Sequence, residues 1–296
     1  MPKYVYKNGN SIVVIDSTDG TKERMTKDDD FDLEFPESLD ISCTSFCTAN
    51  CPFCYAKCSV NGHHADIMSA KFVDTLRPYT EVALQLNDLT HPQMIDFLYK
   101  LKDKRIFTNI TVNQIHFEQK EEIIKYLIEK DLIKGMGISL KNPTPEFIER
   151  VKKYPNAVIH VINGIVSPED LEAMRDQGLK LLILGYKNLG RGVEYKEKNN
   201  VNVEMRQRYL YDVLETLPNH FRVLSMDNLA IEQLKPQRFI NKEDWNTIFQ
   251  GEEGTASMFI DLVKGKFGVS SLCSEDEMFP LMNDIVDMFN VVKKVA

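Results

Sequence analysis

The stretch that decides the fold of this chain reads LDISCTSFCTANCPFC, over residues 39–54. Its first half alternates apolar and polar side chains, which is typical of a β-strand with one buried face. Its second half carries Cys47, Cys51 and Cys54 in the spacing CxxxCxxC, with Phe53 directly before the last cysteine. A strand followed at once by a loop of closely spaced thiols predicts a metal site at the end of that strand.

The cysteines are concentrated in one place. Of the six in the chain, five lie between Cys43 and Cys58, and the sixth is Cys273. Disulfide frameworks belong to short secreted chains, and this chain has 296 residues. We therefore expect reduced, metal-binding thiols in a cytoplasmic protein.

Two other metal sites fit the pattern less well. Structural zinc sites pair two short clusters across a longer loop, and only His63 and His64 offer a second half. Ferredoxins use four cysteines per cluster in other spacings. Three thiolates that hold a 4Fe–4S cluster leave one iron open, and an open position distinguishes a reactive metal site from a sealed one. We interpret Cys43 and Cys273 as structural and Cys58 as a neighbour of the cluster.

At these residues the chain resembles the radical S-adenosylmethionine (radical SAM) superfamily, over about residues 39–230. The resemblance implies a 4Fe–4S cluster on Cys47, Cys51 and Cys54, with SAM bound to the open iron. It further implies reductive cleavage of SAM to a 5′-deoxyadenosyl radical, which abstracts hydrogen from a substrate. A narrower resemblance, to a little-characterised radical SAM group of phages and prophages, names no substrate. It rests on four phrases, at residues 61–66, 111–116, 184–187 and 227–230.

The resemblance also implies which residues bind SAM. Phe53 matches an aromatic that packs against adenine. Relatives carry Gly-Gly-Glu after the second strand, whereas this strand ends Leu84-Gln85-Leu86-Asn87-Asp88 without the glycines. Asn87 lies near the position of the usual acid, so we expect Asn87 to accept from the SAM ammonium and Asp88 to supply the missing charge. The remaining SAM-binding positions implied are Ser139, Ile162, Asn163 and Tyr186.

From residue 39 onward, strand-like and helix-like segments alternate, which favours βαβ units and a parallel sheet. We predict an α/β fold: a partial (β/α)6-type TIM-like barrel at 37–216, an N-terminal β meander at 1–36, and an α+β extension at 217–296. The expected strands are 39–44, 81–86, 105–113, 134–140, 157–163, 180–185, 222–228 and 256–262. The expected helices are 67–77, 92–103, 119–130, 144–154, 167–177 and 203–216, with one more near the C-terminus.

Polar residues after the strands are candidates for substrate chemistry, because barrels carry their active sites at the carboxyl ends of the strands. We expect His116 to exchange a proton near neutral pH. Lys187 would hold a phosphate or carboxylate, and Asp227 would pair with it. Arg191 lies in an expected flexible loop, followed by a solvated charge run at 194–198.

Composition limits the partners. The chain has 36 Lys and Arg against 44 Asp and Glu, a net charge of −8, which argues against broad nucleic-acid binding. The N-terminus lacks an apolar signal region and no apolar run is long enough to span a bilayer, so we expect no membrane association.

We expect a small-molecule or peptide substrate and a low-potential electron donor of the flavodoxin or ferredoxin type. Two alternatives remain open: an activase that makes a radical on a partner protein, and a degenerate radical SAM fold that binds a partner without catalysis.

Overall fold

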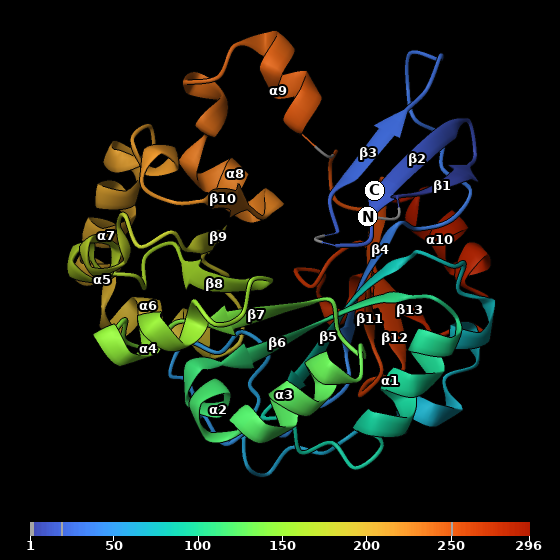
Figure 1. The fold of residues 1–296 in the computed structure, drawn as a ribbon, viewed down its shortest axis with the longest axis horizontal. Coiled ribbons are helices and arrows are strands. Elements are labelled where there is room, and N and C mark those ends of the chain that lie inside the picture. Colours follow the sequence, from blue (N-terminus) through green and yellow to red (C-terminus); the bar gives the residue numbers. More distant parts are fainter. Residues whose placement is uncertain (1–2, 19, 250) are drawn as a thin grey trace.

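The computed structural model describes residues 3–18, 20–249 and 251–296. Its centre is a ten-stranded sheet in the order β10-β9-β8-β7-β6-β5-β4-β11-β12-β13, in which the first eight strands run parallel (Figure 1). The strands are β4 (Ser38–Ser42), β5 (Glu81–Asn87), β6 (Phe107–Asn113), β7 (Gly135–Ser139), β8 (Ala157–Ile162), β9 (Lys180–Leu184), β10 (Val223–Met226), β11 (Ser257–Asp261), β12 (Lys266–Gly268) and β13 (Phe279–Pro280). The predicted mixed α/β fold with a mostly parallel sheet is confirmed. Among the described residues no strand pairing joins β10 to the other edge, so the sheet is not a closed barrel.

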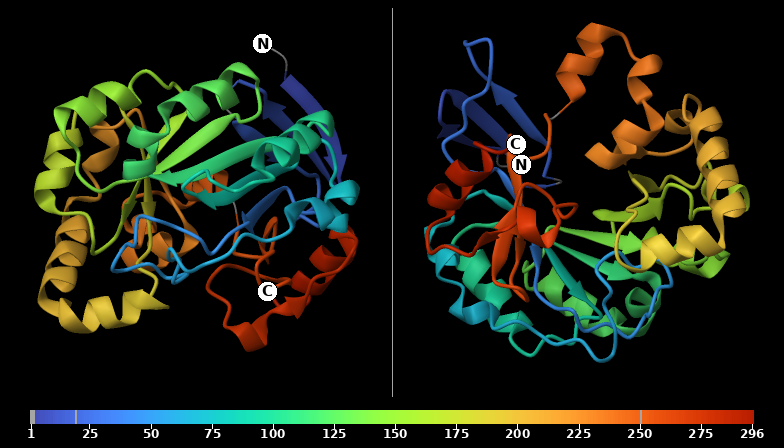
Figure 2. Two further views of the ribbon diagram at one scale, coloured as in Figure 1. Left: turned by 90° about the horizontal axis from the view of Figure 1, so that it is seen from below. Right: turned by 180° about the vertical axis from the view of Figure 1, so that it is seen from behind.

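Most of the helices lie along the convex face of the parallel strands (Figures 1 and 2). The helices in the described part of the chain are α1 (Met94–Asp103), α2 (Gln114–Gln119), α3 (Glu121–Glu129), α4 (Pro145–Val151), α5 (Pro168–Met174), α6 (Arg191–Lys198), α7 (Asn200–Val213), α8 (Asn228–Leu234), α9 (Lys242–Ile248) and α10 (Ile285–Val292). Helix α9 has no buried residue and projects away from the sheet (Figure 1). Five 3-10 turns complete the chain: η1 (Ile67–Ser69), η2 (Lys71–Thr75), η3 (Leu217–Asn219), η4 (Pro236–Arg238) and η5 (Glu275–Glu277).

Successive side chains of a strand point alternately to the helical layer and to the concave side of the sheet, as in β5. Val82, Leu84 and Leu86 are almost fully buried against the helical layer. The alternate residues, Gln85 and Asn87 among them, face the concave side, where they line a cavity. The apolar convex face drives packing of the helices, so the concave face is free to carry polar groups.

The N-terminal meander consists of β1 (Lys3–Asn8), β2 (Ser11–Asp16) and β3 (Lys22–Met25). Asn8 pairs with Ser11, so Gly9 and Asn10 form the turn between β1 and β2. Gly9 has φ +59°, and a side chain there would collide with the backbone of the following connector. Asp19-Gly20 is a second turn signal in the sequence, and Asp19 lies outside the described residues.

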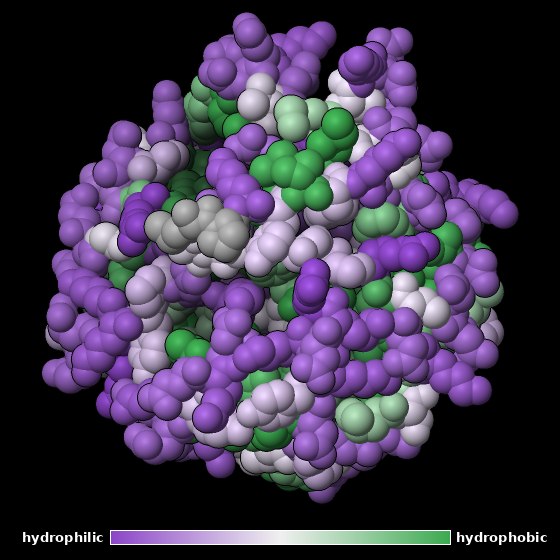
Figure 3. Space-filling model, turned by 45° about the vertical axis from the view of Figure 1, so that its right-hand side comes forward, coloured by the Kyte–Doolittle hydropathy of each residue, from purple (hydrophilic) through white to green (hydrophobic). Residues whose placement is uncertain are grey.

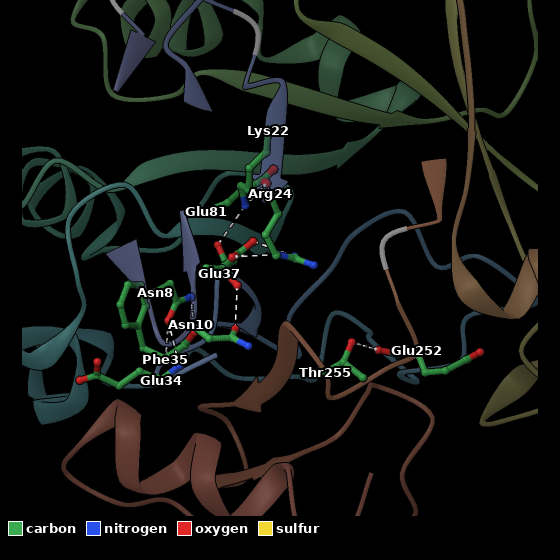
Figure 4. A network of polar contacts seen from close by, with 11 residues as sticks. Asn8, Asn10, Lys22, Arg24, Glu34, Phe35, Glu37, Glu81, Glu252 and Thr255 are labelled. Atoms are coloured by element: carbon green, nitrogen blue, oxygen red, sulfur yellow. Dashed lines mark hydrogen bonds and ion pairs between the residues drawn. The ribbon is translucent and has the colours of Figure 1, made fainter. Parts of the chain in front are cut away.

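Ion pairs attach the meander to the sheet (Figure 4). Arg24 makes a two-pronged contact with the buried Glu37 just before β4, with Nη2 2.8 Å from Oε2. Lys22 lies 3.6 Å from Glu81 at the start of β5. The meander therefore lies beside the amino ends of β4 and β5, away from the cysteine loop.

Several predicted elements need correction. The expected helix at 67–77 is two 3-10 turns, because Ala70 between them is extended. Residues 191–198, expected as a loop and charge run, form α6, which exposes most of its charged side chains. The last predicted helix is limited to α10. The extension at 217–296 is expected to complete or cover the barrel, and its strands β10 and β11 pair within the central sheet.

The face drawn in Figure 3 is mostly hydrophilic, and its hydrophobic groups are divided into small patches. No helix in the described part of the chain combines the length and apolar character needed to cross a membrane.

Candidate active site

A cavity of about 700 Å³, here called the main cavity, occupies the concave side of the sheet. Residues of β4 to β10 line it, because every second side chain of these strands points to that side. Cys47, Cys51 and Cys54 line the same cavity, on the loop that follows β4. The polar strand residues around it include Asp40, Gln85, Asn109, Thr111, Asn113, Ser139 and His160.

The cysteine loop, residues 43–66, is closed by pairing its two ends. Ser45 N donates to His63 O at 3.0 Å, and Cys47 N donates to Ser59 O at 2.9 Å. Gly62 lies so close to the backbone of Ser45 that a side chain would not fit. The loop therefore has a fixed base, and its central residues are displayed at the carboxyl end of the sheet.

Arg191, the first residue of α6, fixes the centre of the loop. Its Nε donates to Cys51 O at 3.0 Å and its Nη2 donates to Cys58 O at 2.9 Å. Its backbone N–H donates to Cys54 O at 3.1 Å. The expected role of Arg191 in a flexible loop is corrected: it is a structural support of the cysteine loop.

The three motif cysteines share one environment. Burial raises the pKa of Cys47 and Cys51, and the neighbouring thiols add to the effect. The pKa of Cys54 is lowered to about 6, chiefly by a hydrogen bond with Cys58 and further by the Arg191 charge. Asn113 Nδ2 donates to Cys51 Sγ at 3.6 Å.

The donor set fits an iron–sulfur cluster. All three thiols are free of disulfides, half-buried, and on one loop beside a cavity. Soft thiolates with N–H donors to sulfur are the ligands that such clusters use. Among the described residues, no three Cys, His, Asp or Glu side chains are already arranged around a common metal position.

The other cysteines occupy different places. Cys43 is fully buried in the hydrophobic core, and burial raises its pKa. Cys58 is 4% exposed and contacts Cys54, which matches its interpretation as a neighbour of the motif. Cys273 is half-buried near Gly268, in the C-terminal hairpin.

Five of the seven expected SAM-binding residues line the main cavity with the cysteines: Phe53, Asn87, Ser139, Ile162 and Tyr186. Asn87 ends β5 with φ +54°, a conformation that Asn tolerates better than most residues. Its Nδ2 donates to Thr44 O at 3.1 Å and to Phe46 O at 2.8 Å. The amide nitrogen is thus engaged, and the amide oxygen is the atom left to accept from a ligand.

Asp88 and His116 do not line the main cavity, which corrects both expectations. The positive φ of Asn87 turns the chain, and Asp88 is buried, accepting from Thr90 Oγ1 at 2.6 Å and Thr48 Oγ1 at 3.3 Å. His116 is 1% exposed, with Nε2 2.8 Å from Thr48 Oγ1. Both line a second cavity of about 400 Å³ with Thr48.

Asn163 is also absent from the main cavity. It is 2% exposed, and its Nδ2 donates to Gln233 Oε1 at 2.9 Å. The same Gln233 oxygen accepts from Tyr186 N at 2.9 Å, and Gln233 Nε2 donates to Tyr186 O at 3.0 Å. Gln233, which the sequence reasoning missed, holds the turn after β9.

Lys187 and Asp227 both line the main cavity, but the expected ion pair is absent from the described residues. Lys187 Nζ donates to Ser271 Oγ at 2.6 Å and lies 4.0 Å from the Tyr55 ring centroid. Asp227 Oδ1 accepts from Gly185 N at 2.8 Å and caps α8. Burial raises the pKa of Asp227.

Three further cavity residues were not singled out from the sequence. Asp40 and His160 lie on the concave side of β4 and β8. The alternation of side chains along these strands could have identified both. Burial lowers the pKa of His160 to about 4. Glu253 comes from an irregular segment before β11, and no sequence pattern marked it.

No family model matches the chain, and no curated protein matches it. Among solved structures it is similar to the crystal structure of Streptococcus suis SuiB, with 12% sequence identity and a TM-score of 0.59. The match covers 97% of this chain and 86% of that chain. At this identity the likeness shows the fold alone.

Proposed function

We propose that this protein is a radical SAM enzyme. One observation carries the proposal: the CxxxCxxC cysteines and five residues that the resemblance assigns to SAM line one cavity, and all of them lie at the carboxyl ends of the parallel strands. Those residues come from the cysteine loop, β5, β7, β8 and the segment after β9, which are far apart in sequence. Convergence on one cavity is expected of a cofactor site and is not required by packing alone.

The finer architecture belongs to the same proposal. The open, curved sheet, with eight parallel strands around a polar concave side, supports the partial TIM-like barrel. Active sites of such folds lie at the carboxyl ends of the strands, where the cysteine loop lies here.

In this proposal Cys47, Cys51 and Cys54 hold a 4Fe–4S cluster. Such a cluster would supply the electron for cleavage of the SAM sulfonium, which would give methionine and a 5′-deoxyadenosyl radical able to abstract hydrogen from a substrate. Arg191 holds the backbone of the ligand loop, since it bonds two of its carbonyls. Asn113 places an N–H donor on the Cys51 sulfur, and such donors raise the reduction potential of a cluster.

The remaining residues orient SAM and exclude water. The Asn87 oxygen accepts from the SAM ammonium, and Phe53, braced by Tyr195 with ring centroids 5.6 Å apart, packs against the adenine. Ser139, Ile162 and Tyr186 form the rest of the SAM-binding wall. A small-molecule or peptide substrate would occupy the polar part of the cavity, and a flavodoxin or ferredoxin type donor would supply the electron.

One observation favours a second candidate, the degenerate fold that binds a partner without catalysis. Asp88 is turned away from the main cavity, so SAM would meet a neutral amide at Asn87 where relatives carry a carboxylate. A neutral acceptor binds an ammonium more weakly than a charged one. The two candidates differ in whether SAM is cleaved.

Cluster assembly tests the ligand assignment. After anaerobic reconstitution, we expect about four irons and four sulfides per chain, and a change in the electron paramagnetic resonance spectrum of the reduced cluster when SAM is added. Alanine at Cys47, Cys51 or Cys54 should abolish assembly. Cys273→Ser is the matched control and should retain it. Full iron loading in a triplet variant would refute the assignment.

A further inference from the structure

Two carboxyl groups in the main cavity have no hydrogen-bond or ion-pair partner among the described residues. Asp40 projects from the middle of β4, and Glu253 projects from the segment that leads into β11. Neither forms a hydrogen bond or ion pair with any described residue. The Asp40 side chain is exposed to the open space of the cavity, where a ligand can reach it.

The segment that carries Glu253 is held in place on both sides. Asn228 Nδ2, at the start of α8, donates to Gly251 O at 3.1 Å. Thr255 Oγ1 donates to Glu252 O at 2.7 Å, which closes a turn around Glu253 (Figure 4). Gly254 packs against Val292 of α10. Glu253 therefore lies in the cavity wall through the fold of its segment, not as a loose surface side chain.

Nearby cationic charge does not balance these groups. Asp40, Asp227 and Glu253 act on one another electrostatically, and Lys187 is the cation that acts on all three. Lys187 is already bonded to Ser271 and lies against Tyr55. With all groups ionised, three negative charges face one positive charge, which leaves an excess of negative charge in a partly dry space.

The remaining charged groups of the cavity are engaged elsewhere or lie at its other end. Glu81 pairs with Lys22, and Lys134 pairs with Asp131 at 2.6 Å. Lys180 begins β9, at the opposite end of that strand from Lys187. Lys141, an exposed side chain that also lines the cavity, follows β7 and is not among the charges that act most strongly on Asp40 and Glu253. Asp170 accepts from Ser167 N at 3.0 Å.

We infer that the substrate carries a protonated amine or a guanidinium group, which binds between Asp40 and Glu253 in the main cavity. The inference deepens the proposed function, because it names the class of molecule that would receive the radical. The binding itself requires neither the cluster nor SAM.

The electrostatics of the site agree with a cationic ligand. Burial raises the pKa of Asp40, and burial together with the charges of Asp40 and Asp227 raises the pKa of Glu253 to about 7. A bound cation would favour the ionised form of both carboxyls, since opposite charges at short range stabilise each other.

The test measures binding of agmatine, which carries an amine and a guanidinium, to the full chain by calorimetry at about pH 8, above the pKa of about 7 of Glu253. The neutral 1,5-pentanediol and the anionic glutarate are the comparison probes. The variants are Asp40→Asn and Glu253→Gln. Glu252→Gln, an exposed neighbour, is the matched control.

We expect agmatine to bind, and either cavity variant to weaken it by about tenfold or more, because each removes one of two charges facing the cation. Glu252→Gln should leave binding unchanged. Absence of agmatine binding, equal binding of the diol or glutarate, or wild-type affinity in both cavity variants would overturn the inference. Circular dichroism confirms folding, and Glu253→Gln carries the test if Asp40→Asn does not fold.

The two proposals fail separately. A chain that makes 5′-deoxyadenosine but ignores agmatine overturns the cationic substrate and keeps the enzyme. A chain that binds agmatine through Asp40 and Glu253 but never cleaves SAM keeps the cation site and overturns the enzyme.

Discussion

Replacement of Arg191 by alanine should loosen the cysteine loop without unfolding the sheet. The guanidinium donates to the carbonyls of Cys51 and Cys58, at 3.0 and 2.9 Å. Hydrogen bonds from a charged donor contribute about 1.5 kcal/mol or more each, so two contribute about 3 kcal/mol to holding the loop closed. That free energy corresponds to about two orders of magnitude in the opening equilibrium. Arg191→Lys keeps one charged donor but loses the fork, so its effect should be about tenfold.

Hydrogen exchange with mass spectrometry measures this opening. Peptides from residues 43–66 should exchange about a hundredfold faster in Arg191→Ala, while peptides from β6 and β7 should be unchanged. Arg208→Ala is the matched control, because that side chain is 75% exposed and bonds Asp212 on its own helix. If the loop exchanges no faster in Arg191→Ala than in Arg208→Ala, the support assigned to Arg191 is wrong.

Three further predictions concern the same site. Gly190→Ala should lower the free energy of unfolding by about 3 kcal/mol, because φ is +57° and a methyl group would collide with the cysteine loop. Gly178→Ala, also at positive φ but in open space, should lower it by about 1 kcal/mol. Equal melting temperatures of the two variants would contradict the packing argument. Between pH 6.5 and about 4 the unfolded chain binds a proton at His160 that the folded chain does not. The free energy of unfolding should therefore fall by up to about 3 kcal/mol as the pH drops through this range. Urea titrations of His160→Gln at several pH values should show a smaller dependence of this free energy on pH. Asn113→Ala should lower the cluster potential by on the order of 40 mV, since it removes one N–H donor from a cysteine sulfur; an unchanged potential in voltammetry would refute that role.

The mostly parallel α/β sheet, which the sequence predicted correctly, is carried by local patterns. Buried and less buried residues alternate along β5, β8 and β9, because the two faces of one sheet meet different surroundings. The spacing of Cys47, Cys51 and Cys54 lies within eight residues, so the proposed cluster also rests on a local pattern.

The wrong predictions for His116 and for the pairing of Asp227 concern residues that follow the ends of strands, where a helix begins and changes the direction of the chain. Asn113 caps a helix, so α2 begins at once and turns His116 toward the second cavity. Asp227 likewise caps α8, which satisfies its carboxyl locally and removes the need for Lys187. Glu253 reaches the cavity only through tertiary contacts of its segment, and no periodic pattern reports such contacts.

The central claim is that this cavity cleaves SAM, and one anaerobic measurement tests it most directly. The reconstituted protein is incubated with SAM and dithionite, and 5′-deoxyadenosine is quantified by mass spectrometry, with Cys51→Ala as the control. The account predicts 5′-deoxyadenosine from the wild-type chain and none from the variant. An intact cluster that binds SAM but yields no 5′-deoxyadenosine, with agmatine present or absent, would contradict it and favour the non-catalytic fold indicated by Asp88.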